Sequence, residues 1–84
     1  STFTFSFYPN PTTENITMNY SLEESSKVKY VIYDLTGKQV QTEVATRFPG
    51  PQQQSIDVNN LQAGTYLLSL NVNGNVITKR FVKK

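Results

Sequence analysis

The chain contains no cysteine, no histidine and no tryptophan, and these absences exclude several kinds of site. Without cysteine there is neither a disulfide framework nor a thiolate metal site. Without histidine or cysteine, the usual nucleophile–base pairs of hydrolases cannot be built. The serines would have only lysine or a carboxylate as their base, which disfavours a serine hydrolase. We therefore expect a protein that is not an enzyme and that has no cofactor and no bound metal.

The chain also has little excess charge and no long apolar run. Its net charge is +2, far below the basic surface that nucleic-acid binding requires. No apolar run approaches the ~20 residues of a membrane-spanning helix, and no secretory signal peptide opens the sequence. We expect no nucleic-acid partner and no membrane insertion. If the protein is exported, its signal peptide lies upstream, in a longer parent.

The stretch from Leu61 to Lys84 predicts a hairpin. Its two arms meet at Asn73-Gly74, the dipeptide best suited to a type I′ turn because both positions need a positive φ. The first arm is apolar enough for the centre of a sheet, whereas the second is expected to form a solvent-facing edge. The cations of the second arm are Lys79, Arg80, Lys83 and Lys84.

Further stretches with period-two alternation of apolar residues predict more strands. They cover residues 3–7, 15–22, 27–34, 39–45 and 54–58. The prolines after Tyr8 end the first of them. Gly37 is expected in the left-handed position of a hairpin loop, and Val40 and Val44 are expected to point inward. Residues 46–53 are expected to form an irregular crossing between two sheets.

Seven short strands, no helical periodicity and 84 residues predict one all-β domain. The expected fold is a small seven-stranded antiparallel immunoglobulin-like β-sandwich, with a short β-roll as the alternative. Oligomeric state is left open between a monomer and a strand-exchanged dimer, because the first strand is rich in phenylalanine and an edge is open.

The Glu23-Glu24 pair, the group around Asp57 and the aromatic residues each have a structural and a functional interpretation. Glu23-Glu24 predicts a solvated turn rather than a catalytic carboxylate pair. Asp57 with its neighbouring asparagines predicts turn chemistry rather than calcium binding. A carbohydrate-binding platform would need exposed rings on one face, and only three rings are candidates for the surface. These are Tyr8, Tyr33 and Phe48.

The terminal cation cluster also has two interpretations. It protects an edge strand against unwanted pairing, or it is a recognition tag. In the second case, a flexible basic end on a rigid sheet offers unpaired backbone for strand addition to a partner. Composition does not separate them.

Four motifs fall in one order along the chain. They are Tyr8-Pro9-Asn10-Pro11-Thr12, residues 31–38, the group Ile56-Asp57-Val58 with Leu61, Gly64 and Tyr66-Leu67-Leu68, and residues 79–84. Together they resemble the type A C-terminal sorting domain of the type IX (Por) secretion system of Bacteroidota. The resemblance covers residues 8–84. Residues 1–7 are expected to be a linker or a first strand.

The resemblance implies a non-catalytic signal domain at the end of a larger, covalently fused cargo protein. In the family, the cargo passes through the periplasm and reaches the cell surface or is secreted. The implied partners are the type IX translocon and an outer-membrane shuttle or sortase-like peptidase, which usually removes the domain. The alternative function is a carbohydrate-binding or adhesive β-sandwich module of a secreted enzyme.

The resemblance also implies recognition residues, by match to the family's motifs. Those toward the C-terminus are Gly64, Tyr66, Lys79, Arg80, Phe81, Val82, Lys83 and Lys84. Those of the N-terminal motifs are Pro9, Asn10, Pro11 and Gly37.

Overall fold

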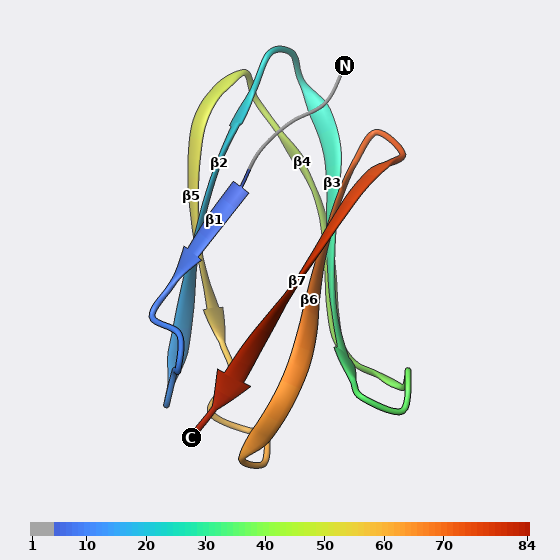
Figure 1. Cartoon of the computed structure of the whole chain (residues 1–84). Helices are drawn as coiled ribbons and strands as arrows, with labels where there is room; N and C mark the ends of the chain where they lie inside the picture. The colour runs from blue at the N-terminus through green and yellow to red at the C-terminus, as the bar shows by residue number, and fades with distance from the viewer. Residues whose placement is uncertain (1–4) are drawn as a thin grey trace.

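The computed structural model describes residues 5–84, which fold into seven antiparallel strands arranged in two facing sheets (Figure 1). The strands are β1 (Phe5–Tyr8), β2 (Asn15–Leu22), β3 (Ser26–Asp34), β4 (Gln39–Arg47), β5 (Gly50–Asp57), β6 (Gly64–Val72) and β7 (Asn75–Lys83). One sheet has the order β1-β2-β5 and the other the order β4-β3-β6-β7. The expected seven-stranded antiparallel β-sandwich is confirmed. Phe3, expected in the first strand, lies outside the described residues.

The core fills the space between the two sheets with alternate residues of each strand. On β3, Val28, Tyr30 and Ile32 are buried while Lys27 and Lys29 are exposed, as period-two alternation predicts. Leu61 and Ile77 are half-buried against the edge of this core. Within residues 5–84, no helix is long and apolar enough to cross a membrane.

The predicted final hairpin is confirmed. Asn73 and Gly74 both have positive φ, 52° and 92°, as a type I′ turn requires. Strand β6 lies between β3 and β7, and β7 is the last strand of its sheet. The second arm is therefore an edge strand, as its cations indicated.

The prediction that Val44 points inward is wrong. Val44 is 49% exposed, because it pairs with Lys29 on the outer face of the four-stranded sheet. A β-bulge beside Tyr33 shifts the register of β4 relative to β3. Val40, at the bulge near the start of β4, does pack against the core and is half-buried.

The crossing between the sheets is confirmed, but it is shorter than expected. Strand β4 extends to Arg47 and β5 begins at Gly50, so the predicted irregular stretch is mostly strand. Pairing with all eight residues of β2 extends β5 through Pro51. Proline is tolerated there because β5 is an edge strand and the missing N–H is not needed by the ladder.

Candidate functional site

The C-terminal strand β7 is anchored to the core by an aromatic stack. The Phe81 side chain is fully buried. Its ring centroid lies 5.6 Å from that of Tyr66, at an interplanar angle of 22°, and 6.3 Å from that of Phe7, edge to face. The Tyr66 hydroxyl donates a hydrogen bond to the Gln62 carbonyl at 2.7 Å. Phe81 therefore joins the two sheets, and it contacts Tyr66, another predicted recognition residue.

The same strand is held from outside by the segment Pro9–Thr12, which we call the strap. The Thr12 N–H donates to the Val82 carbonyl at 2.9 Å, and the Lys84 N–H donates to the Thr12 carbonyl at 2.8 Å. Thr12 is only 1% exposed, and its hydroxyl donates to the Asn15 carbonyl at 2.6 Å. Thr12 thus makes a short parallel bridge to β7.

Asn10 extends this contact with its side chain. Its Oδ1 accepts a hydrogen bond from the Val82 N–H at 3.0 Å, and its Nδ2 donates to the Arg80 carbonyl at 3.4 Å. The amide group imitates the donor and acceptor of a neighbouring strand. Pro9 and Pro11 lack an N–H, so the residues between and after them supply the contacts.

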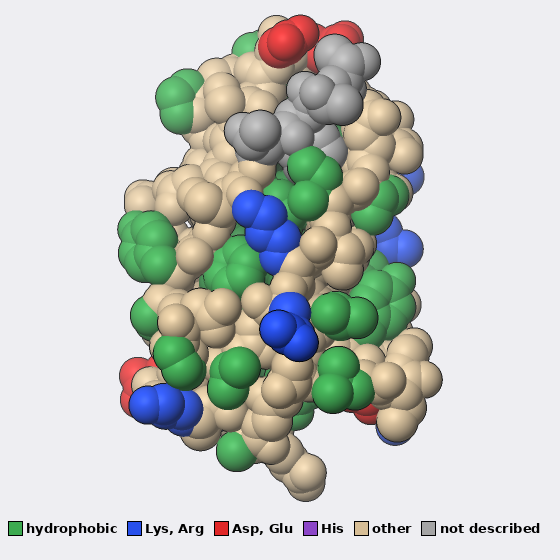
Figure 2. Space-filling view, viewed as in Figure 1, with side chains coloured by type: hydrophobic (Ala, Val, Ile, Leu, Met, Phe, Trp, Pro, Cys, Tyr) green, Lys and Arg blue, Asp and Glu red, His purple; other side chains and the backbone are tan. Residues whose placement is uncertain are grey.

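The four terminal cations differ in their surroundings. Arg80 and Lys84 are exposed. The Lys79 ammonium donates to the Phe5 carbonyl at 2.7 Å and lies 5.1 Å from the Phe5 ring centroid, which links β7 to β1. Lys83 is only 8% exposed, and its ammonium donates to the Lys84 carbonyl at 3.1 Å. Figure 2 shows cationic side chains along the face that carries β7.

This end of the chain is not a flexible basic tail, the form that the recognition-tag interpretation gave it, but part of an edge strand. Residues up to Lys83 belong to β7, Phe81 is in the core, and the backbone of Val82 and Lys84 is bonded to Thr12. The end of the chain is ordered by tertiary contacts. The strap supplies its hydrogen-bond partners from about seventy positions away in the sequence, as the bond between Asn10 and Val82 shows.

The turn between β3 and β4 is built around Asp34. Its carboxylate accepts hydrogen bonds from the Thr36 hydroxyl, from the Thr36 N–H at 2.9 Å and from the Lys38 N–H at 3.0 Å. These bonds, led by that of the Thr36 hydroxyl, hold the pKa of Asp34 below its usual value. Gly37 has φ +89°, which confirms the expected left-handed position.

With the exception of Lys79, the predicted N-terminal and C-terminal residues gather at one end of the sandwich. Asp34 of the β3–β4 turn pairs with Tyr66, and Tyr66 pairs with Phe81. The strap then adjoins β7 at the same level through Asn10. Figure 1 shows the β3–β4 turn, the start of β6 and the end of β7 at this common end. The gathered residues are Pro9, Asn10, Pro11, Gly37, Gly64, Tyr66 and those from Arg80 to Lys84.

Two residues of this arrangement were missed by the sequence analysis as site residues. Thr12 provides the buried bridge to β7, and Phe7 packs on Phe81. The sequence carried a signal for each: Thr12 closes the Pro-Asn-Pro motif, and Phe7 alternates with polar residues. Neither signal identifies the distant strand that the residue contacts.

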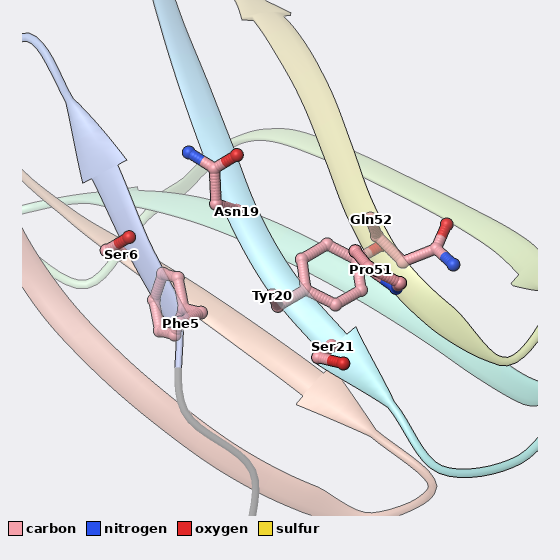
Figure 3. Close-up of a pocket in the computed structure, with 7 residues that line it drawn as sticks. All are labelled: Phe5, Ser6, Asn19, Tyr20, Ser21, Pro51 and Gln52. Atoms are coloured by element: carbon pink, nitrogen blue, oxygen red, sulfur yellow. The ribbon is translucent and has the colours of Figure 1, made fainter.

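An open pocket lies toward the opposite end of the three-stranded sheet (Figure 3). Its two aromatic rings, Phe5 and Tyr20, are buried in the core and present no face to a sugar. Burial raises the pKa of the Tyr20 hydroxyl, although the charge of nearby Arg47 opposes this. The lining residues are Phe5, Ser6, Asn19, Tyr20, Ser21, Pro51 and Gln52.

The exposed rings do not form a platform either. Tyr8 and Phe48 are exposed, and Tyr33 is half-buried. Tyr8 pairs with Thr17 near the start of β2, whereas Phe48 precedes β5, whose first residue pairs with the last residue of β2. The two fully exposed rings are therefore near opposite ends of the sheet.

The acidic groups of residues 5–84 form no metal site: no three of them are grouped as ligands. The Asp57 carboxylate accepts the Asn59 N–H at 2.8 Å, which is the predicted turn chemistry.

Fold and site define a small β-sandwich domain whose distinctive feature is a C-terminal edge strand locked between a core stack and a strap. Residues 6–84 match the family described as secretion system C-terminal sorting domain. The chain belongs to this family, whose members are sorting signals for type IX secretion. No curated protein compared with the chain shows significant similarity to it.

Proposed function

We propose that this domain directs a covalently fused cargo from the periplasm through the type IX translocon to the cell surface, without chemistry of its own. Membership of the sorting-domain family supports export as the role. The family resemblance further supports an outer-membrane shuttle and a sortase-like peptidase as partners. The peptidase would then remove the domain and release the cargo or attach it to the surface.

The observation that carries the proposal is the gathering of both sets of family-matched residues at one end of the molecule. In our proposal, Arg80 and Lys84 present exposed charge to the translocon, and Val82 presents a partly exposed apolar group between them. Phe81, Tyr66 and Gly64 support this strand from within its sheet. Lys79 and Lys83 hold its course through hydrogen bonds to carbonyl groups.

The residues of the N-terminal motifs have a supporting role in the proposal. Asn10 holds the outer edge of β7, and Pro9 and Pro11 shape the strap that carries it. Gly37 allows the tight β3–β4 turn beside Tyr66. We keep residues 8–84 as the proposed sorting domain, with residues 1–7 as linker or first strand. Because Phe5 is in the core, an experiment should use residues 1–84 together.

The direct test fuses residues 1–84 behind a reporter that carries a signal peptide, in a type IX-competent bacterium. We expect the reporter at the cell surface or in the medium, and in the periplasm of a strain that lacks the translocon. A reporter that stays periplasmic in the competent strain, with the domain folded and intact, would contradict the proposal.

The exposed charges are tested separately by Arg80→Ala with Lys84→Ala, in the same fusion. Both side chains are exposed, so the fold should persist while export falls. Lys27→Ala with Lys29→Ala, which removes two exposed cations of β3 away from this end, should leave export unchanged. Equal export in both double variants would contradict the role given to the terminal charges.

A further inference from the structure

The outer edge of β7 is partly covered and partly open. Strand β7 pairs with β6 on one side and ends its sheet on the other. The Val82 N–H and carbonyl and the Arg80 carbonyl point away from β6, since they bond to the strap. The register between β6 and β7 has no shift. Strand alternation therefore directs the backbone groups of Val76 and Thr78 outward as well.

The strap occupies only the C-terminal part of this edge. It bonds to the Arg80 carbonyl, to both backbone groups of Val82 and to the Lys84 N–H. Among residues 5–84 no other strand pairs with β7 from outside. Considering residues 5–84 alone, the segment from Val76 to Arg80 thus leaves five outward backbone groups for a partner: two at Val76, two at Thr78 and the Arg80 N–H.

Charge indicates what kind of strand fits this open segment. The stretch from Asn73 to Lys84 holds four cations and no carboxylate. A second copy of β7 would bring a second set of four cations to the same edge, and like charges opposite one another destabilise strand pairs. A strand that carries Asp or Glu would instead gain opposite-charge pairs with Arg80.

We propose that the edge from Val76 to Arg80 is a strand-addition site for one extended, acidic segment of the export machinery, and that the strap sets its end. Main-chain hydrogen bonds supply affinity, and Arg80 at the junction with the strap supplies charge selectivity. This inference rests on the proposed function and specifies how its recognition surface is engaged. The strap fills the positions beyond Arg80. The added strand is therefore confined to the half of β7 that follows the Asn73-Gly74 turn.

The test removes an N–H that points away from β6 and leaves the backbone hydrogen bonds between β7 and β6 in place. Thr78→Pro removes a donor on the open edge and places a ring there, which an edge strand tolerates. The matched control is Ser55→Pro on β5, the outer strand of the other sheet. Val58 bonds to Glu14 in register with β2, so alternation directs the Ser55 N–H outward too. Ser55 is exposed.

In the reporter fusion, we expect Thr78→Pro to reduce export at least tenfold and Ser55→Pro to leave it unchanged. Circular dichroism and thermal melting of each variant domain verify the fold. Normal export by a folded Thr78→Pro variant, while the unmodified fusion is exported, would overturn the strand-addition site and leave the proposed function standing. Failure of the unmodified fusion would overturn the function, and the inference with it.

A charge reversal covers the case in which Thr78→Pro does not fold. Arg80→Glu changes an exposed side chain, and Lys29→Glu is its match on the same outer face of the sheet. We expect export to fall at least tenfold for Arg80→Glu only, and equal export of the two variants would overturn the proposal. A dimer of the purified domain that Arg80→Glu dissociates would also overturn it, by assigning the edge to a second copy.

Discussion

Phe81 is the residue on which the C-terminal strand depends most. Its ring contacts Tyr66 within its own sheet and Phe7 from the facing sheet, and no part of it reaches solvent. The adjacent residues Arg80 and Val82 are exposed. One residue thus fixes the position at which its neighbours present their side chains.

Phe81→Ala should destabilise the domain by about 3–5 kcal/mol, because it removes a fully buried ring and leaves a cavity. A domain of this length is expected near the low end of ~5–15 kcal/mol, so the variant should be close to unfolding. Urea denaturation followed by circular dichroism measures the change. Val82→Ala, at the half-exposed neighbouring position, is the control, and equal small losses in the two variants would contradict the packing described here.

Two buried tyrosines should make the domain sensitive to alkali. Burial raises the pKa of Tyr20 and of Tyr30 above the ordinary tyrosine value of about 10. At Tyr30 the hydrogen bond from Gln41 works against this rise. Because each folded-state pKa lies above the unfolded one, the unfolded state loses its protons first as pH increases. The stabilisation is complete below about pH 10 and is lost as pH rises through the folded-state pKa values.

We expect a level melting temperature between pH 8 and pH 9.5 and a fall above about pH 10. Tyr20→Phe should flatten that fall, since phenylalanine has no proton to lose. The same alkaline loss in Tyr20→Phe as in the unmodified domain would assign it to other groups.

At the scale of elements, the strap determines how the edge strand is presented. It leaves the three-stranded sheet after β1 and pairs with the outside of β7 in the other sheet. Asn10 and Thr12 make all of its hydrogen bonds to β7. The strap therefore closes the sandwich at the end where the family-matched residues gather.

Asn10→Ala should loosen this closure without unfolding the domain. It leaves the Val82 N–H without its acceptor, a loss of about 1 kcal/mol of local stability. Amide hydrogen exchange at Val82 should then accelerate about fivefold. Exchange at Leu68, in the centre of the sheet, should change little. Asn60→Ala, in an exposed turn, is the control, and unchanged exchange at Val82 in Asn10→Ala would contradict the strap contact.

The sequence predicted the elements better than their long-range contacts. The bounds of β2 and the turns at Gly37 and at Asn73-Gly74 follow from local alternation and turn chemistry, and they are correct. The length of β5 was missed because prolines signal a break locally, while pairing with β2 overrides that signal. Val44 was misplaced because a bulge shifts the alternation in β4 relative to its neighbour.

The candidate site shows the same limit more strongly. The family-matched motifs were visible as separate stretches, and the cations predicted an edge strand. Their meeting at one end could not be predicted, because it depends on pairing between residues as distant as Asn10 and Val82. The burial of Phe81 could not be predicted either, because apolar and polar residues alternate poorly in the sequence of β7.

At the scale of the whole molecule, the sandwich makes a surface from segments that are far apart in sequence. Pairing within the four-stranded sheet brings the β3–β4 turn, the start of β6 and the end of β7 to one end, and the strap from the other sheet then pairs with β7 there (Figure 1). If the translocon recognises this surface, the folded domain is the signal, and the terminal residues alone are not sufficient.

An unfolded variant that keeps every predicted recognition residue tests this claim most directly. Ile32 is fully buried in β3, away from the strap and β7, so Ile32→Asp places an unpaired charge in the core and should unfold the domain. Export of the intact reporter fusion is measured for this variant and for Lys29→Asp on the exposed face of the same strand. We predict that Lys29→Asp is exported normally and that full-length Ile32→Asp fusion stays in the periplasm. Normal export of the unfolded Ile32→Asp fusion would show that a linear tail is read, and would contradict the account.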